Sequence, residues 1–404
     1  MTEATPSNER GGALPARRFG IFLAGFSAFL GMYATQPILP MLERLFGVSK
    51  AEAALTVTAP TIAVAIAAPF AGALGSRFGH RRIILGALFG LTVPMFLAAT
   101  ATSVPALVAW RFAQGLLVPG IYVVTIALIA EEWPAGGVAK ATAAFVAGNV
   151  VGGFTGRLAS GLVAEHFGWR AAFVLLGGLT ALAAHAASRA LPRSHRARRP
   201  VASYGPRLGL LLEEPRLLAT CAIGFNVLFT QVAIFTYVTF YLAAPPFGLG
   251  SAAISGIFVV YLLGAAVTPL AGRWIDRVGS RRAVSTAFGI AIVGGVLTLS
   301  HRLGWVELGL TVTCTAVFAS QSAATAFLRV VVPAEACSAA SGLYVSSYYL
   351  GGALGGVAPA VAWHVGGWPA CVALVAALQV ATIALVWRFW RTARSPEGVA
   401  LLAA

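Results

Sequence analysis

Charged side chains are scarce in this sequence, because Asp, Glu, Lys and Arg together make up only 10% of its 404 residues. A soluble domain carries about 25% charged residues, so this chain cannot cover a surface that faces water. Hydrophobic residues make up 58% of the chain, and its mean hydropathy is +0.84. These values predict an integral membrane protein whose main surroundings are the lipid bilayer.

Acidic residues and cysteines are also rare. Asp276 is the only aspartate. No Asp or Glu falls in the middle of an apolar segment, and Glu307 lies close to the end of one. The four cysteines contain no C-x-x-C pair, which argues against a disulfide framework. The apolar segments hold no convergent set of catalytic or metal-ligating residues, and the chain has no Walker-type loop. We therefore expect no enzymatic activity, no metal and no cofactor.

Basic residues outnumber acidic ones by 28 to 13. In a soluble protein this excess would indicate nucleic-acid binding, but here the basic residues cluster in short loops between apolar segments, so we expect no nucleic-acid partner. With both termini in the cytoplasm, 22 of the 28 lie on the cytoplasmic side. This bias predicts that orientation. The four on the opposite side are Arg44, Lys50, Arg170 and Arg302.

Twelve apolar segments approach the roughly 20 residues that a transmembrane helix needs. The first is too long for a signal-peptide core and lacks a cleavage site, so we expect it to be retained as a helix. The expected spans are 19–40, 54–75, 83–100, 104–129, 140–163, 171–190, 217–242, 251–271, 283–300, 305–328, 339–363 and 370–387.

The two halves of the chain resemble each other at a nearly constant offset. GALGSRFGHRR at 72–82 aligns with GRWIDRVGSRR at 272–282, and GGFTGR at 152–157 aligns with GGALGG at 351–356. Such repeats are typical of transporters whose substrate site lies between the halves. We predict a six-helix half over residues 1–191, a basic cytoplasmic linker over 192–216 and a second six-helix half over 217–404.

The repeated loop resembles the signature of the major facilitator superfamily, G-x-x-x-[DE]-R-x-G-[RK]-[RK]. The first copy departs from it at Ser76, where the family usually has an acidic residue. Further matches are the R-x-x-Q-G pattern at Arg111, Gln114 and Gly115, and a partial antiporter motif in the fifth span. With YATQPILP in the first span, the chain is similar to bacterial exporters of the drug:proton antiporter and sugar-efflux branches.

This resemblance implies an all-α polytopic membrane protein, with twelve transmembrane helices in two pseudo-symmetric six-helix bundles. It also implies a monomer in the bacterial inner (plasma) membrane. The expected partners are a small-molecule substrate and protons.

The arginines of the loop motif can pair with carboxylates at neighbouring helix ends and so hold an outward-open state. The alternative is that they only set the topology. The predicted gating residues are Gly72, Arg77, Gly79, Arg81, Arg82, Glu131, Glu132, Gly272, Asp276, Arg277, Gly279, Arg281, Arg282 and Glu335.

Glycines with small-xxx-small spacing occur on the fifth and eleventh spans. They allow close helix packing, and we expect them to face the opposite half, where a smooth surface permits rocking. The alternative is ordinary packing between neighbouring helices. The predicted interface glycines are Gly148, Gly152, Gly156, Gly351, Gly352, Gly355 and Gly356.

Arg111 and Arg157 lie inside spans, where an arginine costs at least about 2.5–3.5 kcal/mol. We expect both to face the central cavity at a common depth and to favour an anionic or polyhydroxyl ligand, because guanidinium offers five donors. The alternative is that they snorkel to the outer interface. The predicted cavity residues are Arg111, Gln114, Arg157, Tyr33, Gln36, Asn149, Asn226, Gln231 and Gln321.

These features favour a secondary transporter that moves a small organic molecule by alternating access. The resemblance implies that it is an exporter driven by proton antiport. An uncoupled facilitator or an importer of a sugar or organic anion is the second possibility. A membrane-embedded enzyme lacks its catalytic residues, and a channel would need a filter loop or a ring of like charges.

Overall fold

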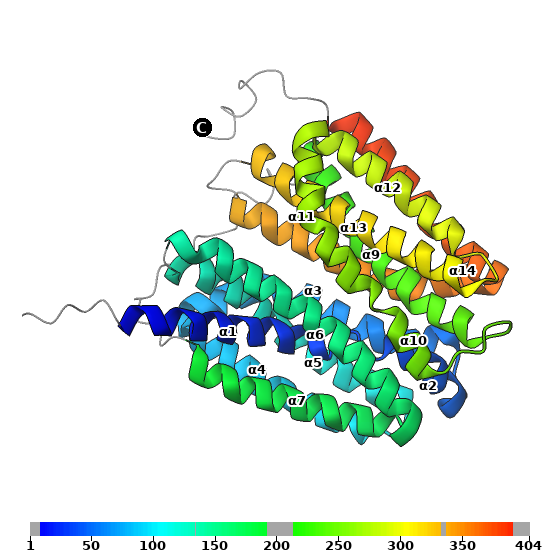
Figure 1. Cartoon of the computed structure of the whole chain (residues 1–404), viewed down its shortest axis with the longest axis horizontal. Helices are drawn as coiled ribbons and strands as arrows, with labels where there is room; N and C mark the ends of the chain where they lie inside the picture. Colours follow the sequence, from blue (N-terminus) through cyan, green and yellow to red (C-terminus); the bar gives the residue numbers. More distant parts are fainter. Residues whose placement is uncertain (1–8, 134, 192–212, 333–336, 391–404) are drawn as a thin grey trace, which may run out of the picture.

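The computed structural model describes residues 9–133, 135–191, 213–332 and 337–390, and within them the chain is helical without strands (Figure 1). This confirms an all-α protein. Most of the predicted linker lies outside the described residues. The N-terminal half contains α1 (Glu9–Leu30), η1 (Gln36–Ile38), α2 (Leu39–Phe46), α3 (Lys50–Phe78), α4 (His80–Ala99), α5 (Val104–Glu132), η2 (Ala135–Gly137), α6 (Val138–Phe167) and α7 (Trp169–Ala190).

The C-terminal half contains α9 (Pro215–Ala243), α10 (Ser251–Ile257), α11 (Val260–Val278), α12 (Ser280–Leu297), α13 (Leu303–Val331) and α14 (Cys337–Phe389). In the described part of the chain, seven helices are long and apolar enough to cross a membrane, and a segment bent by 52° between Val267 and Leu270 would be an eighth. The α14 run joins two helices across non-helical backbone at Gly366 and Gly367. The arrangement is consistent with twelve spans.

The first span differs from the continuous helix predicted over 19–40. Helix α1 ends at Leu30, a turn follows, and the chain resumes as η1 and α2. Pro37 and Pro40 supply no N–H to a helix running through this segment, and each proline ring would crowd the carbonyl four residues earlier. The break therefore leaves main-chain carbonyls that need other donors within the membrane.

The internal repeat is visible in the backbone. Gly79 and Gly279 adopt φ values of +93° and +80°, and each turns the chain between two helices, α3 to α4 and α11 to α12. Gly168 and Gly367 do the same at φ +84° and +62°. A side chain is strained in this region of φ, so glycine is required at equivalent turns in both halves.

The glycines of α6 and α14 mainly pack helices within their own half, so the prediction that they face the opposite half is wrong for six of the seven. A Cβ at Gly148, Gly152 or Gly156 would overlap carbonyl oxygens of Phe22, Phe26 or Leu30 on α1. Three glycines of α14 pack against α9 in the same way: Gly351, Gly352 and Gly355.

Gly356 is the exception among the seven, because a Cβ there would overlap Thr58 of α3 in the other half. The same spacing of small residues suits any close neighbour. The sequence pattern therefore specified close packing without specifying the partner helix.

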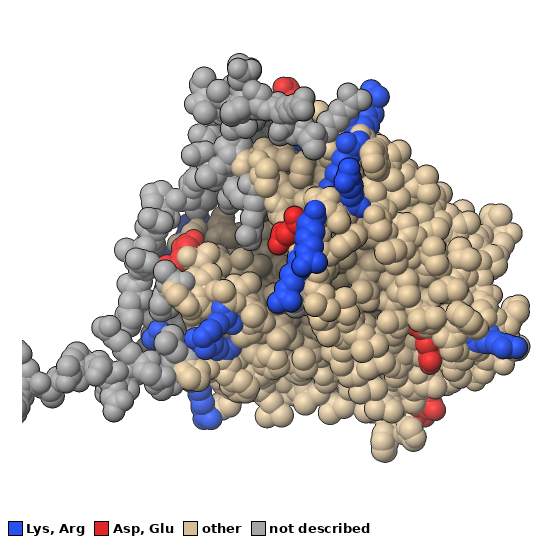
Figure 2. All heavy atoms as spheres, turned by 45° about the horizontal axis from the view of Figure 1, so that its top comes forward, with Lys and Arg blue, Asp and Glu red and all other residues tan. Residues whose placement is uncertain are grey.

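The two halves meet at one end of the molecule and lie apart at the other (Figure 1). We call the end that holds Gln36, Lys50, Thr236 and Ala252 the closed end, and the opposite one the open end. A Cβ at Gly72, near the open end, would meet no atom within 4 Å, and the same holds for Gly272. Figure 2 shows a hollow in the surface, with charged side chains around it.

Candidate functional site

A chain of polar contacts joins the halves towards the closed end. Gln36 of η1 donates from Nε2 to Thr236 Oγ1 of α9 at 3.1 Å. The Oε1 atom of the same Gln36 accepts a hydrogen bond from Nε of Arg157 on α6 at 2.8 Å. One glutamine therefore connects an arginine of the N-terminal half to a threonine of the C-terminal half, and both of its polar ends are used.

The Arg157 guanidinium lies among three aromatic rings. Its Cζ is 4.8 Å from the ring centre of Tyr33, 5.1 Å from that of Phe258 and 4.5 Å from that of Tyr261. Phe258 and Tyr261 belong to the C-terminal half, so the cation bridges the halves by cation–π contacts. The side chain is only 4% exposed, and its Nη1 donates to the Gly153 carbonyl at 2.9 Å.

Two further contacts lie at the rim of the closed end. The Glu165 carboxylate of α6 accepts a hydrogen bond from the main-chain N–H of Ala252, in the first turn of α10, at 2.6 Å. An acidic group is favoured there because the N–H groups of the first helical turn lack helical acceptors.

Lys50, at the start of α3, pairs with Glu43 at 2.7 Å. Its ammonium also lies 5.6 and 5.5 Å from the ring centres of Phe240 and Trp363 in the C-terminal half. Both rim contacts thus join opposite halves through a charged side chain.

Arg111 has a different environment from Arg157. Arg111 is 0% exposed. Its Nε donates to the Thr56 carbonyl of α3 at 2.9 Å. Its Nη1 donates to the Gly31 carbonyl at 2.6 Å, and its Nη2 donates to the Met32 carbonyl at 2.5 Å. Nη1 also donates to Gln114 Oε1. The prediction that Arg111 faces the cavity is therefore wrong, and the arginine does not reach the outer interface either.

The acceptors of Arg111 are carbonyls that lack helical donors. Gly31 and Met32 lie just past the end of α1, where the helix breaks. Thr56 lies four residues before Pro60, which has no N–H to donate to it. Unsatisfied carbonyls are costly inside a membrane, so Arg111 and its partner Gln114 stabilise the helix break. Ser160 assists by donating to the Ala34 carbonyl at 2.5 Å.

The other predicted cavity residues are dispersed. Asn226 is fully buried and bonds Thr382 Oγ1 at 2.7 Å, so it packs α9 against α14 within one half. Asn149 lies against α1 at Gly25. Gln321 is partly exposed, and Gln231 is 6% exposed with no described hydrogen-bond partner for Nε2. Of the nine, the structure brings Tyr33, Gln36 and Arg157 together between the halves.

A cluster of aromatic side chains continues from Tyr33. Tyr348 and Tyr349 of α14 pack with ring centres 5.3 Å apart, and Tyr122 of α5 packs on Phe29 at 5.8 Å. Tyr33 and Tyr349 belong to one buried hydrophobic cluster, and Tyr122 and Tyr348 pack against it. These five side chains, the aromatic cluster, therefore draw on both halves.

Among the described residues, two loop arginines bind main-chain carbonyls in place of the predicted carboxylates. Arg81 donates to the carbonyls of Ser188 and Leu191, at the end of α7, at 2.6 and 3.2 Å. Arg281 donates to the Trp387 carbonyl near the end of α14 at 2.7 Å. The last carbonyls of a helix lack helical donors and attract cations. These equivalent arginines therefore cap the sixth helix of their own half.

The carboxylates predicted as their partners lie elsewhere or outside the described structure. Glu131 faces His80, with Oε2 3.8 Å from Nε2, which ties the end of α5 to the start of α4. The Glu132 side chain and Glu335 lie outside the described residues. The remaining polar side chains of the loop motif are exposed at the open end: Arg77, Arg82, Asp276, Arg277 and Arg282.

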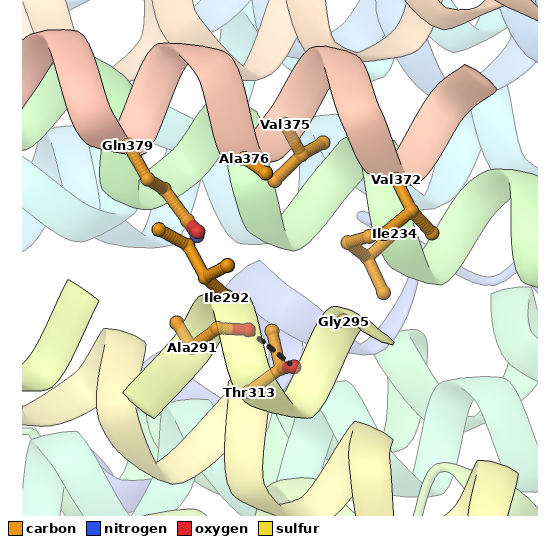
Figure 3. Close-up of a pocket in the computed structure, with 9 residues that line it drawn as sticks. All are labelled: Ile234, Ala291, Ile292, Gly295, Thr313, Val372, Val375, Ala376 and Gln379. Atoms are coloured by element: carbon orange, nitrogen blue, oxygen red, sulfur yellow. Dashed lines mark hydrogen bonds between the residues drawn. The ribbon is translucent and has the colours of Figure 1, made fainter. Parts of the chain in front are cut away.

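A small, partly open pocket lies away from this region (Figure 3). It is lined by residues of α9, α12, α13 and α14 of the C-terminal half, which are mainly aliphatic, with Thr313 and Gln379 as polar members. Because no residue of the N-terminal half contributes to it, this pocket does not connect the two halves. The arrangement around Arg157 does, and it is the better candidate for a substrate site.

Sequence reasoning missed several residues of the closed end, namely Thr236, Phe258, Tyr261, Glu165 and the ring contacts of Lys50. Thr236, Phe258 and Tyr261 are ordinary members of apolar segments and carry no local signal. Glu165 and Lys50 are charged residues at span ends on the predicted non-cytoplasmic side, where few charged residues occur. Their rarity there could have marked them as candidates for contacts between the halves. Their partners become apparent only in the folded chain.

Comparison with known proteins agrees with this architecture. The Major Facilitator Superfamily profile matches residues 21–356. The MFS-type transporter YybF of Bacillus subtilis is 27% identical over 94% of both chains, and the inner membrane transport protein YnfM of Escherichia coli is 28% identical over 92% of this chain and 89% of that one.

Two solved structures share the fold. A bacterial homologue of the human lysosomal transporter Spinster, in an inward-facing and occupied conformation, superposes with a TM-score of 0.73 at 17% identity, over 98% of this chain and 100% of that one. The nucleoside transporter NupG superposes with a TM-score of 0.77 at 12% identity, over 93% and 100%. The chain therefore belongs to the Major Facilitator Superfamily and is a multi-pass membrane transporter, not an enzyme.

Proposed function

We propose that the protein is a secondary transporter that exports a small organic molecule by alternating access in exchange for protons. The observation that carries this proposal is the asymmetry between the ends of the molecule. Hydrogen bonds and cation–π contacts join the halves at the closed end, whereas the halves lie apart at the open end (Figure 1). A binding site between two such halves is accessible from one side at a time.

The open end is proposed to face the cytoplasm. The loops at this end carry most of the chain's Lys and Arg, among them Arg77, Arg82, Arg277 and Arg282, and basic loops stay in the cytoplasm. The arrangement would then be the inward-facing state, which is also the state of the Spinster homologue. In this state a cytoplasmic substrate can enter, and rocking of the halves would release it on the other side.

Proton coupling has few titratable groups to use. Arg111 and Arg157 occupy the middle of the N-terminal half, and the described spans hold no carboxylate near them. The His80–Glu131 pair, between α4 and α5 at the open end, is the titratable pair we propose for coupling. An uncoupled facilitator or an importer of a sugar or organic anion is the alternative that the lack of central carboxylates favours.

Transport into proteoliposomes tests the proposal. Vesicles that contain a pH-sensitive dye receive a panel of sugars, organic acids and cationic drugs on the outside. An antiporter that takes up its substrate releases protons, so the internal pH rises. A facilitator lets labelled substrate equilibrate without a pH change. Protein-free vesicles provide the background.

A reversible crosslink tests alternating access itself. The Glu165 carboxylate reaches the Ala252 N–H across the closed end, so cysteines at both positions should be joined by a short thiol-specific crosslinker that is cleaved by reductant and that locks the halves together. We expect transport to stop when the crosslinker is added and to return with reductant, whereas either single cysteine should transport in both conditions. Transport that continues with the crosslink formed would contradict alternating access.

A further inference from the structure

We propose that the transported substrate is an organic anion with a flat apolar body, and that Arg157 holds its carboxylate. This inference rests on the proposed transport function and specifies the class of substrate. It starts from the charge of Arg157. The guanidinium is 4% exposed, and no described carboxylate pairs with it. A buried cation without a counter-ion is unfavourable, so an anion that enters beside it gains a charge-assisted bond.

The geometry leaves one edge of the guanidinium available. Nε is bonded to Gln36, one N–H of Nη1 is bonded to Gly153, and three rings surround the group. The two N–H groups of Nη2 and the second of Nη1 have no described acceptor. These three N–H groups can donate charge-assisted hydrogen bonds to a carboxylate.

Arg111, in contrast, has almost no N–H donor left for a ligand. Carbonyls of three residues and Gln114 occupy four of its five N–H groups, and its exposure is 0%. Both arginines carry the same charge in the same half, but only Arg157 lies between the halves with donors to spare. The anion site is therefore assigned to Arg157 alone.

The body of the substrate is inferred from the aromatic cluster. Tyr33 contacts the Arg157 guanidinium and shares a buried hydrophobic cluster with Tyr348 and Tyr349 of the other half. Aromatic rings favour flat apolar partners through stacked and edge-to-face contacts. A ligand whose carboxylate reaches Arg157 would thus place its body beside rings of both halves.

The test measures thermal stabilisation of the purified protein by four small probes: benzoate, acetate, benzamide and benzylamine. Benzoate has both features, acetate lacks the ring, benzamide lacks the charge and benzylamine has the opposite charge. We expect benzoate to raise the Tm progressively with its concentration, acetate to need at least a tenfold higher concentration for the same rise, and the other two to have no effect. A ligand that binds only the folded state stabilises it by RT ln(1 + L/Kd), where L is the free ligand concentration.

Three variants locate the effect. Arg157→Gln should weaken benzoate binding at least tenfold, and Arg157→Lys, which keeps the charge and loses the fork, should fall between it and the wild type. Arg170→Gln is the matched control, because Arg170 is exposed at the start of α7 and bonds the Ala101 carbonyl. It should bind benzoate like the wild type. Circular dichroism and gel filtration verify that each variant is folded.

Several results would overturn the assignment. They are no stabilisation by benzoate, equal stabilisation by benzamide or benzylamine, or unchanged benzoate binding by a folded Arg157→Gln variant. The transport function would survive such a result if vesicles accumulate a sugar or a cation and the Glu165–Ala252 crosslink still stops that uptake. If the crosslink leaves uptake unchanged, the proposed mechanism itself fails.

Discussion

Replacing Arg111 by lysine tests whether this arginine is a structural donor. The variant keeps the positive charge but presents its donors from one nitrogen, whereas the guanidinium reaches the Thr56 carbonyl of α3 and the Gly31 and Met32 carbonyls after α1 from three nitrogens. We expect the lysine to serve the Thr56 or the Met32 carbonyl and to leave the other without a donor, while the Gly31 carbonyl keeps only the turn bond from the Ala34 N–H at 3.4 Å. Folding should suffer even though the charge is unchanged.

The expected loss follows from the number of orphaned carbonyls. Each buried polar group left without a partner costs about 1–3 kcal/mol, so the one carbonyl left without a donor costs about that much, and the weakened Gly31 carbonyl adds to it. The free energy of unfolding of a native protein is only about 5–15 kcal/mol. Arg111→Lys should therefore unfold at a much lower SDS fraction than the wild type, as monitored by tryptophan fluorescence of the detergent-purified protein.

Pro60 provides an internal check on the mechanism. Pro60→Ala restores a main-chain N–H that can bond the Thr56 carbonyl, so one acceptor of Arg111 no longer depends on it. In the Pro60→Ala background, Arg111→Lys should lower the free energy of unfolding by about 1–3 kcal/mol less than it does in the wild type. A double-mutant cycle measures this difference.

Pro69→Ala on the same helix is the control, because Arg111 has no bond to the carbonyl that this proline leaves free. Its effect should be additive with that of Arg111→Lys. Two results would refute the idea that Arg111 compensates for a missing helical donor. One is that the effects of Pro60→Ala and Arg111→Lys on the free energy of unfolding are additive, and the other is that Pro69→Ala shows the same coupling energy as Pro60→Ala.

Three further predictions concern gating and topology. Glu165→Ala should open the closed end, so an impermeant maleimide should label a cysteine at Thr236 several-fold faster than in the wild type. Glu165→Gln retains an acceptor and should change this labelling rate less. If Glu165→Ala labels at the wild-type rate, the bond has no role in closing this end. Asp276→Asn should reduce transport more than Ser76→Ala, since only the second loop has a carboxylate, and equal losses would mean that both loops serve topology alone. A cysteine at Pro200 should resist the same reagent in intact cells if the linker is cytoplasmic, and rapid labelling would reverse the orientation.

Local patterns were sufficient to predict the fold. Long apolar segments favour membrane helices because the backbone must be satisfied internally in lipid. The repeated loop predicted equivalent turns, and Gly79 and Gly279 adopt the same left-handed backbone. Both inferences depend on residues close together in the sequence, and both hold without knowledge of tertiary contacts.

The helix break in the first span was missed although the sequence contains its signal. Pro37 and Pro40 follow Gly31 within ten residues, and prolines at that spacing remove two helical donors. Hydropathy outweighed them in the prediction, because the segment is apolar throughout. Breaks of this kind are common where irregular backbone lines a cavity.

The difference between Arg111 and Arg157 could not be predicted from either residue. Both are arginines about six residues from the end of a predicted span, and the insertion cost is the same for each. What separates them is the set of unsatisfied acceptors nearby. A break after α1 and a proline at Pro60 create carbonyls that Arg111 fills, while Arg157 meets one glutamine and three rings. A membrane arginine therefore has to be interpreted together with the prolines and helix breaks of the neighbouring spans, because those decide whether donors remain for a ligand.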